Sequence, residues 1–201
     1  TGTLTQNLMT VVDHYGQDEK QLAIAMALCS DAEIDDEGKV TGEPTEAALV
    51  AYAAKLGYPK NALKQEYPRV GEAPFDSGRK MMSTVHKSGS GYVQYTKGAP
   101  DEILKKCQSA LVDGKIVPMT PDILKAALTD NKRMADKALR VLAAAFRLYE
   151  TEPTSYEAAD LEKDLIFLGL EGMIDPVRPE VKDSIVECRS AGITPIMITG
   201  D

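Results

Sequence analysis

The sequence lacks the features of a membrane-spanning or secreted chain. Its longest apolar runs, at 142–146 and 193–198, fall far short of the roughly 20 residues that a membrane-spanning helix needs. The first residues have neither the basic start nor the apolar stretch of a signal peptide, and without an initiating Met they are expected to be a cut end. We therefore predict no membrane insertion by this chain.

Cysteine and histidine are scarce. The 3 cysteines are widely spaced and form no C-x-x-C pair, so neither a disulfide framework nor a zinc site is indicated and a reducing, cytosolic setting fits best. His14 and His86 lie far apart without other ligands at metal-binding spacing. The acidic stretch 31–37 lacks the full spacing of a calcium-binding loop. The sequence predicts no metal site.

Basic residues are also fewer than acidic ones. The 23 Lys and Arg residues against 31 Asp and Glu give a net charge of -8, which argues against nucleic-acid binding because that depends on clustered cations. An anionic nucleotide is still compatible, since screening over about 8 Å lets a local basic pocket outweigh distant charge. The chain does have the composition of a globular protein, with 43% hydrophobic residues. Its length fits one domain, or one domain plus fragments of another.

Periodicity predicts an α+β fold with an antiparallel β-sheet flanked by helices. Apolar positions recur at helical spacing at 18–29, 44–56, about 101–108 and about 122–139. Pro44 and the pair Thr120-Pro121 are typical of helix starts. A turn at 88–90 predicts a hairpin between two of the expected strands. The expected strands are 69–75, 80–87, 91–96, 140–148 and 165–173.

The last forty residues have a different pattern. Residues 180–190 place Val181, Ile185 and Cys188 on one helical face, and Gly192 ends that helix. Residues 195–199 form a continuous apolar run that predicts a buried parallel strand. Open α/β sheets hold ligands at the carboxyl ends of such strands, so we expect this segment to belong to a second domain.

Five separated segments together resemble the P-type (E1-E2) cation-transporting ATPases, in the order and spacing of that family over the whole chain. The match looks closest to the calcium-transporting subgroup. The segments are 1–5 (TGTLT), 42–46 (GEPTE), 97–100 (KGAP), 175–178 (DPVR) and 197–201 (MITGD).

The resemblance implies a nucleotide-binding domain at 7–174, with fragments of an α/β, haloacid-dehalogenase-like phosphorylation domain at 1–6 and 175–201. The family transfers a phosphoryl group from ATP to an aspartate to drive ion transport, and uses Mg²⁺ in the full-length enzyme. The acceptor Asp would precede Thr1, so this chain is expected to bind ATP or ADP without turnover. Its partners would be the phosphorylation, actuator and transmembrane domains, which makes it a cytoplasmic domain of an integral membrane protein, with calcium as the ion implied.

The segment 73–80 resembles the family segment whose Phe stacks on adenine and whose Lys approaches the nucleotide, which implies these roles for Phe75 and Lys80. The alternative for Phe75 is a core residue at a strand end. The family pattern has Arg where this chain has Ser77. Arg79 could replace that phosphate contact only if Gly78 permits a local bend, because side chains alternate along a strand.

The resemblance assigns four further residues to the nucleotide. Lys97 would lie at the mouth of the adenine pocket, beside Gly98, which allows close approach; otherwise it is a surface lysine. Glu46 would accept from the adenine amino group, or simply favour the helix dipole. Arg140 would meet the β-phosphate, and is otherwise a helix-end cation.

The terminal segments match phosphorylation-domain positions. Asp175 and Arg178 would lie at the hinge between domains. The residues that would cradle the transferring phosphate, here as remnants without their partners, are Thr1, Gly2, Thr199, Gly200 and Asp201.

Two other functions are compatible with parts of the sequence. The final TGD resembles the second motif of haloacid-dehalogenase-like phosphatases, although no D-x-D nucleophile motif is present. A non-catalytic interaction domain that uses its sheet face is the third alternative. Nucleotide titration separates these possibilities.

Overall fold

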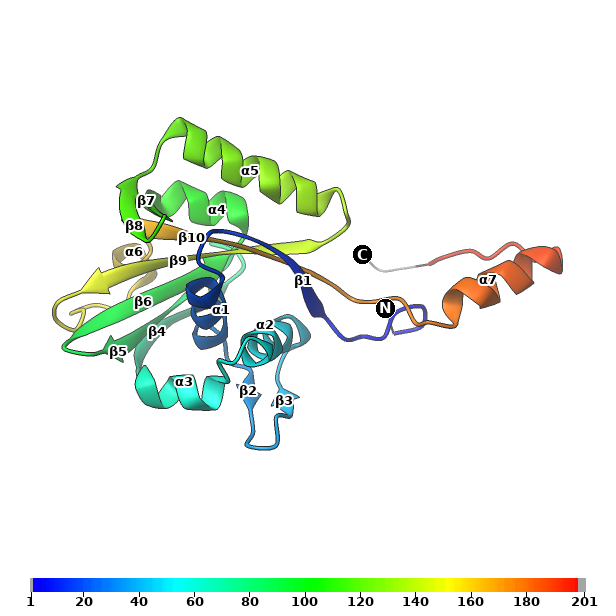
Figure 1. Cartoon of the computed structure of the whole chain (residues 1–201), viewed down its shortest axis with the longest axis horizontal. Coiled ribbons are helices and arrows are strands. Elements are labelled where there is room, and N and C mark those ends of the chain that lie inside the picture. Colours follow the sequence, from blue (N-terminus) through cyan, green and yellow to red (C-terminus); the bar gives the residue numbers. More distant parts are fainter. Residues whose placement is uncertain (1, 199–201) are drawn as a thin grey trace.

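The computed structural model describes residues 2–198, and its centre is an eight-stranded sheet (Figure 1). The strand order is β4-β5-β6-β9-β10-β7-β8, and β1 also pairs with β10. All of these strand pairs are antiparallel except β10 with β7. The strands are β1 (Thr10–Tyr15), β4 (Arg69–Asp76), β5 (Met81–Ser88), β6 (Gly91–Gly98), β7 (Cys107–Val112), β8 (Lys115–Pro118), β9 (Arg140–Tyr149) and β10 (Leu165–Ile174).

Helices cover both faces of this sheet (Figure 1). One apolar cluster joins the sheet to α1, α2 and α3 and contains Leu22, Met26 and Leu49. A second joins it to α4 and α5 and contains Ile103 and Met134. The predicted α+β fold is confirmed. The remaining elements are α1 (Glu19–Leu28), the hairpin β2 (Glu33–Ile34) and β3 (Val40–Thr41), α2 (Pro44–Lys55), α3 (Lys60–Glu66), α4 (Pro100–Lys106), α5 (Pro121–Ala135), α6 (Ala158–Leu161) and α7 (Val181–Ser190).

Side-chain caps explain where the main helices begin. The Asp18 carboxylate accepts from the amide of Gln21 at the start of α1. At the start of α2, Glu43 accepts from two backbone amides and Pro44 occupies the first turn. Thr120 caps α5, as its sequence predicts. Because these signals are local, the predicted starts of all three helices are confirmed to within a residue.

Two predicted helix ends are wrong. The helix expected at 101–108 ends at Lys106, because the next residues enter β7 and pair with β8 and β10. The helix expected at 122–139 ends at Ala135. Ala138 has φ +59, a left-handed conformation that turns the chain back into β9.

Residues 4–6 and 176–178 lie side by side, in a part of the chain that extends away from the sheet (Figure 1). Thr5 and Val177 form an isolated antiparallel bridge. The amide of Arg178 donates to the carbonyl of Leu4 over 2.9 Å, and that of Gln6 to the carbonyl of Pro176 over 3.0 Å. No helix among residues 2–198 is both long and apolar enough to cross a bilayer.

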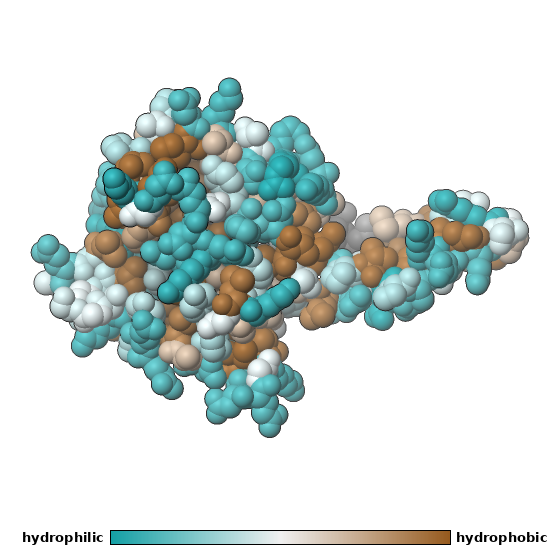
Figure 2. All heavy atoms as spheres, viewed as in Figure 1, coloured by the Kyte–Doolittle hydropathy of each residue, from teal (hydrophilic) through white to brown (hydrophobic). Residues whose placement is uncertain are grey.

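The predicted buried strand at 195–199 is not found in its described part. Residues 193–198 have no regular secondary structure, and Ile198 is 92% exposed. Within the described chain no strand lies beside them, and a parallel strand needs neighbours to satisfy its backbone groups. Figure 2 shows apolar atoms on the surface of this extension, where Val186 and Ile196 are also exposed. Thr199 lies outside the described residues.

Candidate functional site

A pocket of about 470 Å³ lies where β4, β5, β6 and β9 approach the start of α2. The antiparallel register places Met82 of β5 opposite Lys97 of β6, and Lys97 opposite Ala144 of β9. Sequence segments that are far apart therefore meet at one edge of the sheet. Six of the seven predicted nucleotide-binding residues line the pocket: Glu46, Phe75, Lys80, Lys97, Gly98 and Arg140.

A buried ion pair forms one wall of this pocket. Lys97 is only 7% exposed, and its Nζ donates to Glu46 Oε1 over 2.7 Å. The other carboxylate oxygen of Glu46 accepts from the backbone amide of Asp31 over 2.8 Å. Lys97 is therefore not a surface lysine, and two donors fix the Glu46 carboxylate. Such pairing is what allows charges to be held out of water.

The ring of Phe75 is exposed and lines the same pocket. Phe75 is 63% exposed, whereas Phe146 and Phe167 are 6% and 4% exposed. A core role for Phe75 is thus excluded. An exposed aromatic ring beside a hollow offers a flat apolar face on which another planar group can stack.

Two cationic side chains also line the pocket. Lys80 follows the β4–β5 turn, where it has φ +58 and its amide donates to the carbonyl of Asp76 over 2.7 Å. Arg140 opens β9, and its Nη1 donates to Thr45 Oγ1 over 2.7 Å. Within residues 2–198, neither cation has a carboxylate partner within 4.0 Å. Both remain available to an anionic ligand.

Gly98 has a structural role that its sequence context did not predict. A Cβ at this position would lie 2.3 Å from the carbonyl oxygen of Lys80 and 2.6 Å from the Cβ of Met81. No side chain fits in that space. Glycine is therefore required for the close approach of β6 to the start of β5 beside the pocket.

Arg79 lies away from the pocket, contrary to its predicted role as a nucleotide ligand. Its Nε donates to Glu162 Oε2 over 2.8 Å and its Nη2 to the carbonyl of Pro74 over 2.8 Å. Glu162 is 3% exposed, so it holds the guanidinium firmly. Asp76 accepts from the amides of Arg79 and Gly78, and these bonds hold the pKa of Asp76 below its usual value. This turn directs Arg79 toward Glu162, and Arg79 does not line the pocket.

The predicted hinge residues hold the two ends of the chain together. Asp175 accepts from the Thr5 hydroxyl over 2.6 Å and from the Leu8 amide over 3.1 Å. Arg178 Nη2 donates to the carbonyl of Gly2 over 3.0 Å. The other predicted phosphate-site remnants, Thr1, Thr199, Gly200 and Asp201, lie outside the described residues.

Sequence reasoning missed several residues that shape the pocket. Glu43 caps α2 at its rim, Thr45 accepts from Arg140, and Met82 and Leu142 supply apolar lining. The signal for Leu142 was its place in β9, two residues after Arg140 and hence on the same face. Nothing local marked Asp31 as the residue whose amide holds Glu46, because that contact spans 15 residues.

Comparison with known proteins shows the family of this chain. A family model described as P-type ATPase, cytoplasmic domain N, matches residues 18–180. The chain belongs to this family. Its relatives include Calcium-transporting ATPase 1 of Lactococcus lactis, 44% identical, and Calcium-transporting ATPase 1 of Bacillus cereus, 43% identical, each over the whole of this chain. The Cation-transporting ATPase pma1 of Synechocystis is 40% identical over 87% of it.

The chain covers only part of the length of each of these relatives. The chain spans 24% of the Lactococcus and Bacillus proteins and 19% of the Synechocystis protein. The match to the family model includes every residue named above as lining the pocket. Within residues 2–198, no group of three or more His, Cys, Asp or Glu side chains is arranged to hold a metal ion.

Proposed function

We propose that this N domain binds the adenine end of ATP in the pocket beside Phe75. The observation that carries the proposal is the exposed Phe75 ring facing the same hollow as the buried Lys97–Glu46 pair. A purine stacked on Phe75 would place its polar edge toward that pair. Stacking on one aromatic contributes about 1–3 kcal/mol per base. The volume of about 470 Å³ suits a small-molecule ligand.

The unpaired cations account for the phosphate end of the ligand. Lys80 and Arg140 line the pocket together with Phe75, so a nucleotide stacked there extends its phosphates toward positive charge. The guanidinium of Arg140 is suited to bidentate binding of a phosphate, and Lys80 acts as a point charge. Glu46 would accept a hydrogen bond from the adenine amino group.

We further propose that the whole protein is a P-type cation pump that couples ATP hydrolysis to ion transport through an aspartyl phosphate. The family description and the relatives named as calcium-transporting support this, with calcium as the ion. This chain would be the cytoplasmic ATP-binding domain of an integral membrane protein, and its partners the phosphorylation, actuator and transmembrane domains. Mg²⁺ would act with ATP in the full-length enzyme.

The proposed domain division places the nucleotide-binding unit at 7–174 and haloacid-dehalogenase-like fragments at 1–6 and 175–201. It is supported by the pairing of the two chain ends around Asp175, next to the point where β10 ends. The alternative of an interaction domain that uses its sheet face is less favoured, because helices cover both faces of the sheet. The phosphatase alternative is disfavoured by the family match.

Calorimetric titration of the chain with ATP and ADP tests the proposal. We expect dissociation constants of about 0.1–1 mM for both, because the adenine contacts dominate. Mg²⁺ should change either value little. The proposal fails if neither nucleotide binds in the millimolar range, or if ATP binds at least about a hundredfold more tightly than ADP.

A further inference from the structure

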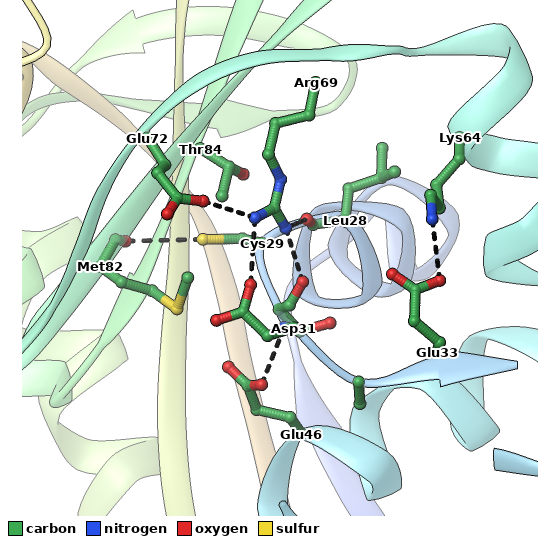
Figure 3. A network of polar contacts seen from close by, with 12 residues as sticks. Leu28, Cys29, Asp31, Glu33, Glu46, Lys64, Arg69, Glu72, Met82 and Thr84 are labelled. Carbon is green, nitrogen blue, oxygen red and sulfur yellow. Dashed lines mark hydrogen bonds and ion pairs between the residues drawn. The ribbon is translucent and has the colours of Figure 1, made fainter. Parts of the chain in front are cut away.

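The carboxylate of Glu46 accepts a hydrogen bond from a segment that does not line the pocket. Residues 30–32 follow the end of α1, and the amide of Asp31 donates to Glu46 Oε2 over 2.8 Å (Figure 3). Lys97 holds the other oxygen from within the pocket. The direction of the free lone pairs of Glu46 therefore depends on where residues 30–32 place one N–H group.

Arg69, the first residue of β4, fixes that segment. Its Nη2 donates to the carbonyls of Leu28 over 3.2 Å and Ser30 over 2.6 Å. Its Nη1 donates to Asp31 Oδ1 over 3.0 Å and to Glu72 Oε2 over 2.7 Å (Figure 3). The carbonyls at the end of a helix lack partners within the helix, and a planar guanidinium can satisfy several at once. One side chain thus ties the end of α1, residue 31 and β4 together.

Lys60 supports the same segment from α3. It is 1% exposed, and its Nζ donates to the carbonyl and hydroxyl of Ser30, over 2.7 Å and 3.3 Å, and to the carbonyl of Ala32. Burial lowers the pKa of Lys60. Because the Lys60 side chain is almost completely buried, its substitution would disturb the fold. Arg69 is partly exposed and does not line the nucleotide pocket, so it is the better residue to examine.

We infer that Arg69 is a positioning residue for purine recognition. By fixing residues 30–32, it presents the Asp31 amide to Glu46 and so sets the direction in which Glu46 meets the base. This inference rests on the proposed function. Adenine offers an amino donor at its 6-position, whereas hypoxanthine offers a carbonyl oxygen there. A carboxylate held by two donors favours the amino group and repels the carbonyl. A carboxylate free to rotate discriminates less between the two bases.

The test compares ATP with ITP on the full 201-residue chain by calorimetry. In Arg69→Met, we expect ATP to bind about three- to tenfold more weakly, as for loss of one hydrogen bond, while ITP changes less than twofold. Arg69→Lys keeps the charge and loses the planar fork, so it should show most of the same loss. Lys132→Met is the matched control. Lys132 lies on α5, where it pairs with exposed Asp136, and its substitution should leave both affinities unchanged.

A double-variant cycle separates positioning from a general loss of structure. In a Glu46→Ala background, Arg69→Met should have no further effect on the ratio of ATP to ITP affinity. Amide hydrogen exchange at Asp31 should also become faster in Arg69→Met, with or without nucleotide. If Arg69→Met does not fold, Glu72→Gln, which loosens the guanidinium, should lower the ATP preference in the same direction.

Equal weakening of ATP and ITP, or an effect of Arg69→Met that persists in Glu46→Ala, would overturn the inference. Unchanged exchange at Asp31 would overturn it as well. If the unmodified chain binds neither nucleotide, the proposed function fails instead, and the exchange result still decides whether Arg69 fixes the segment.

Discussion

Two carboxylate–cation pairs, each with one buried partner, lie on opposite faces of the same strands, β5 and β6. Each pair adjoins a pocket, but only the pocket of the first pair is lined by the exposed Phe75 ring. Lys97 is paired with Glu46 over 2.7 Å on the face that carries Met82. Arg79 is paired with Glu162 over 2.8 Å on the opposite face. The first pair has an exposed ring and unpaired cations beside it, whereas the second has every partner supplied by the protein.

The second pair belongs to a network of hydrogen bonds between protein side chains. The Ser83 hydroxyl donates to Glu162 over 3.4 Å and bonds to Thr96 over 2.8 Å, and Gln94 donates to Thr96 over 2.8 Å. Tyr149 donates in turn to Gln94 over 2.6 Å. Burial of a paired charge therefore does not by itself indicate a ligand site. The distinguishing features are the exposed ring of Phe75 and the two cations without a carboxylate partner, which lie next to the first pair.

The largest effect should come from Arg79→Ala. It leaves the Glu162 carboxylate, which is 3% exposed, without its cation. Breaking a buried pair costs about 3–5 kcal/mol of unfolding free energy, and we expect the lower end of that range because the Arg79 side chain is 33% exposed. Urea unfolding of the variant and the unmodified chain measures this cost. A tenfold loss of ATP affinity with unchanged stability would show instead that Arg79 contacts the nucleotide.

A third carboxyl, Glu171, extends the comparison to a group without any cation. It is fully buried on β10, and neither carboxyl oxygen has a hydrogen-bond partner among the described residues. Burial, with a smaller contribution from the Glu19 carboxylate, raises the pKa of Glu171 to about 8 from its usual 4.5. The folded state therefore keeps a proton that the unfolded state releases.

Glu171→Gln should remove a pH dependence of stability. The contribution of Glu171 is fully present below about pH 4.5 and is lost as pH rises toward about 8, by about 1.4 kcal/mol per pH unit. Between pH 5.5 and pH 7.5, the unmodified chain should lose about 2–3 kcal/mol relative to the variant. Unfolding free energies at both pH values check this. Parallel pH profiles for the two proteins would show that Glu171 is not a buried acid.

The smallest change in stability, with a clear change in binding, should come from Phe75→Ala. We expect ATP binding to weaken by about 1–3 kcal/mol, and the unfolding free energy to change by less than about 0.5 kcal/mol, because the ring is exposed. Phe167→Ala is the matched control, since that ring is buried and its loss should cost about 3–5 kcal/mol of stability. If Phe75→Ala destabilised the chain as much as Phe167→Ala, Phe75 would be a core residue and not an exposed ring at the pocket.

The sequence predicts best those features that depend on neighbouring residues. The starts of α1, α2 and α5 follow from Asp18, Pro44 and Thr120. The β5–β6 hairpin follows from its turn at 88–90. Residues of the pocket could be proposed together because the motifs that carry them resemble one family, although no single segment shows that they meet.

Features that depend on distant partners could not be predicted. Arg79 is directed by Glu162, 83 residues later in the chain. Residues 107–108 form a strand rather than a helix because β7 pairs with β8 and with β10. The short strands β1, β2 and β3 have little periodicity of their own, and the strand expected at 195–199 has no neighbour within the described chain.

The most direct test of the proposed ATP site is an NMR measurement of the chain with bound ATP. We expect nuclear Overhauser contacts between the adenine protons and the ring of Phe75, with chemical-shift changes at Lys97 and Glu46. Shift changes confined to the opposite face, around Arg79 and Glu162, with no contact to Phe75, would contradict it.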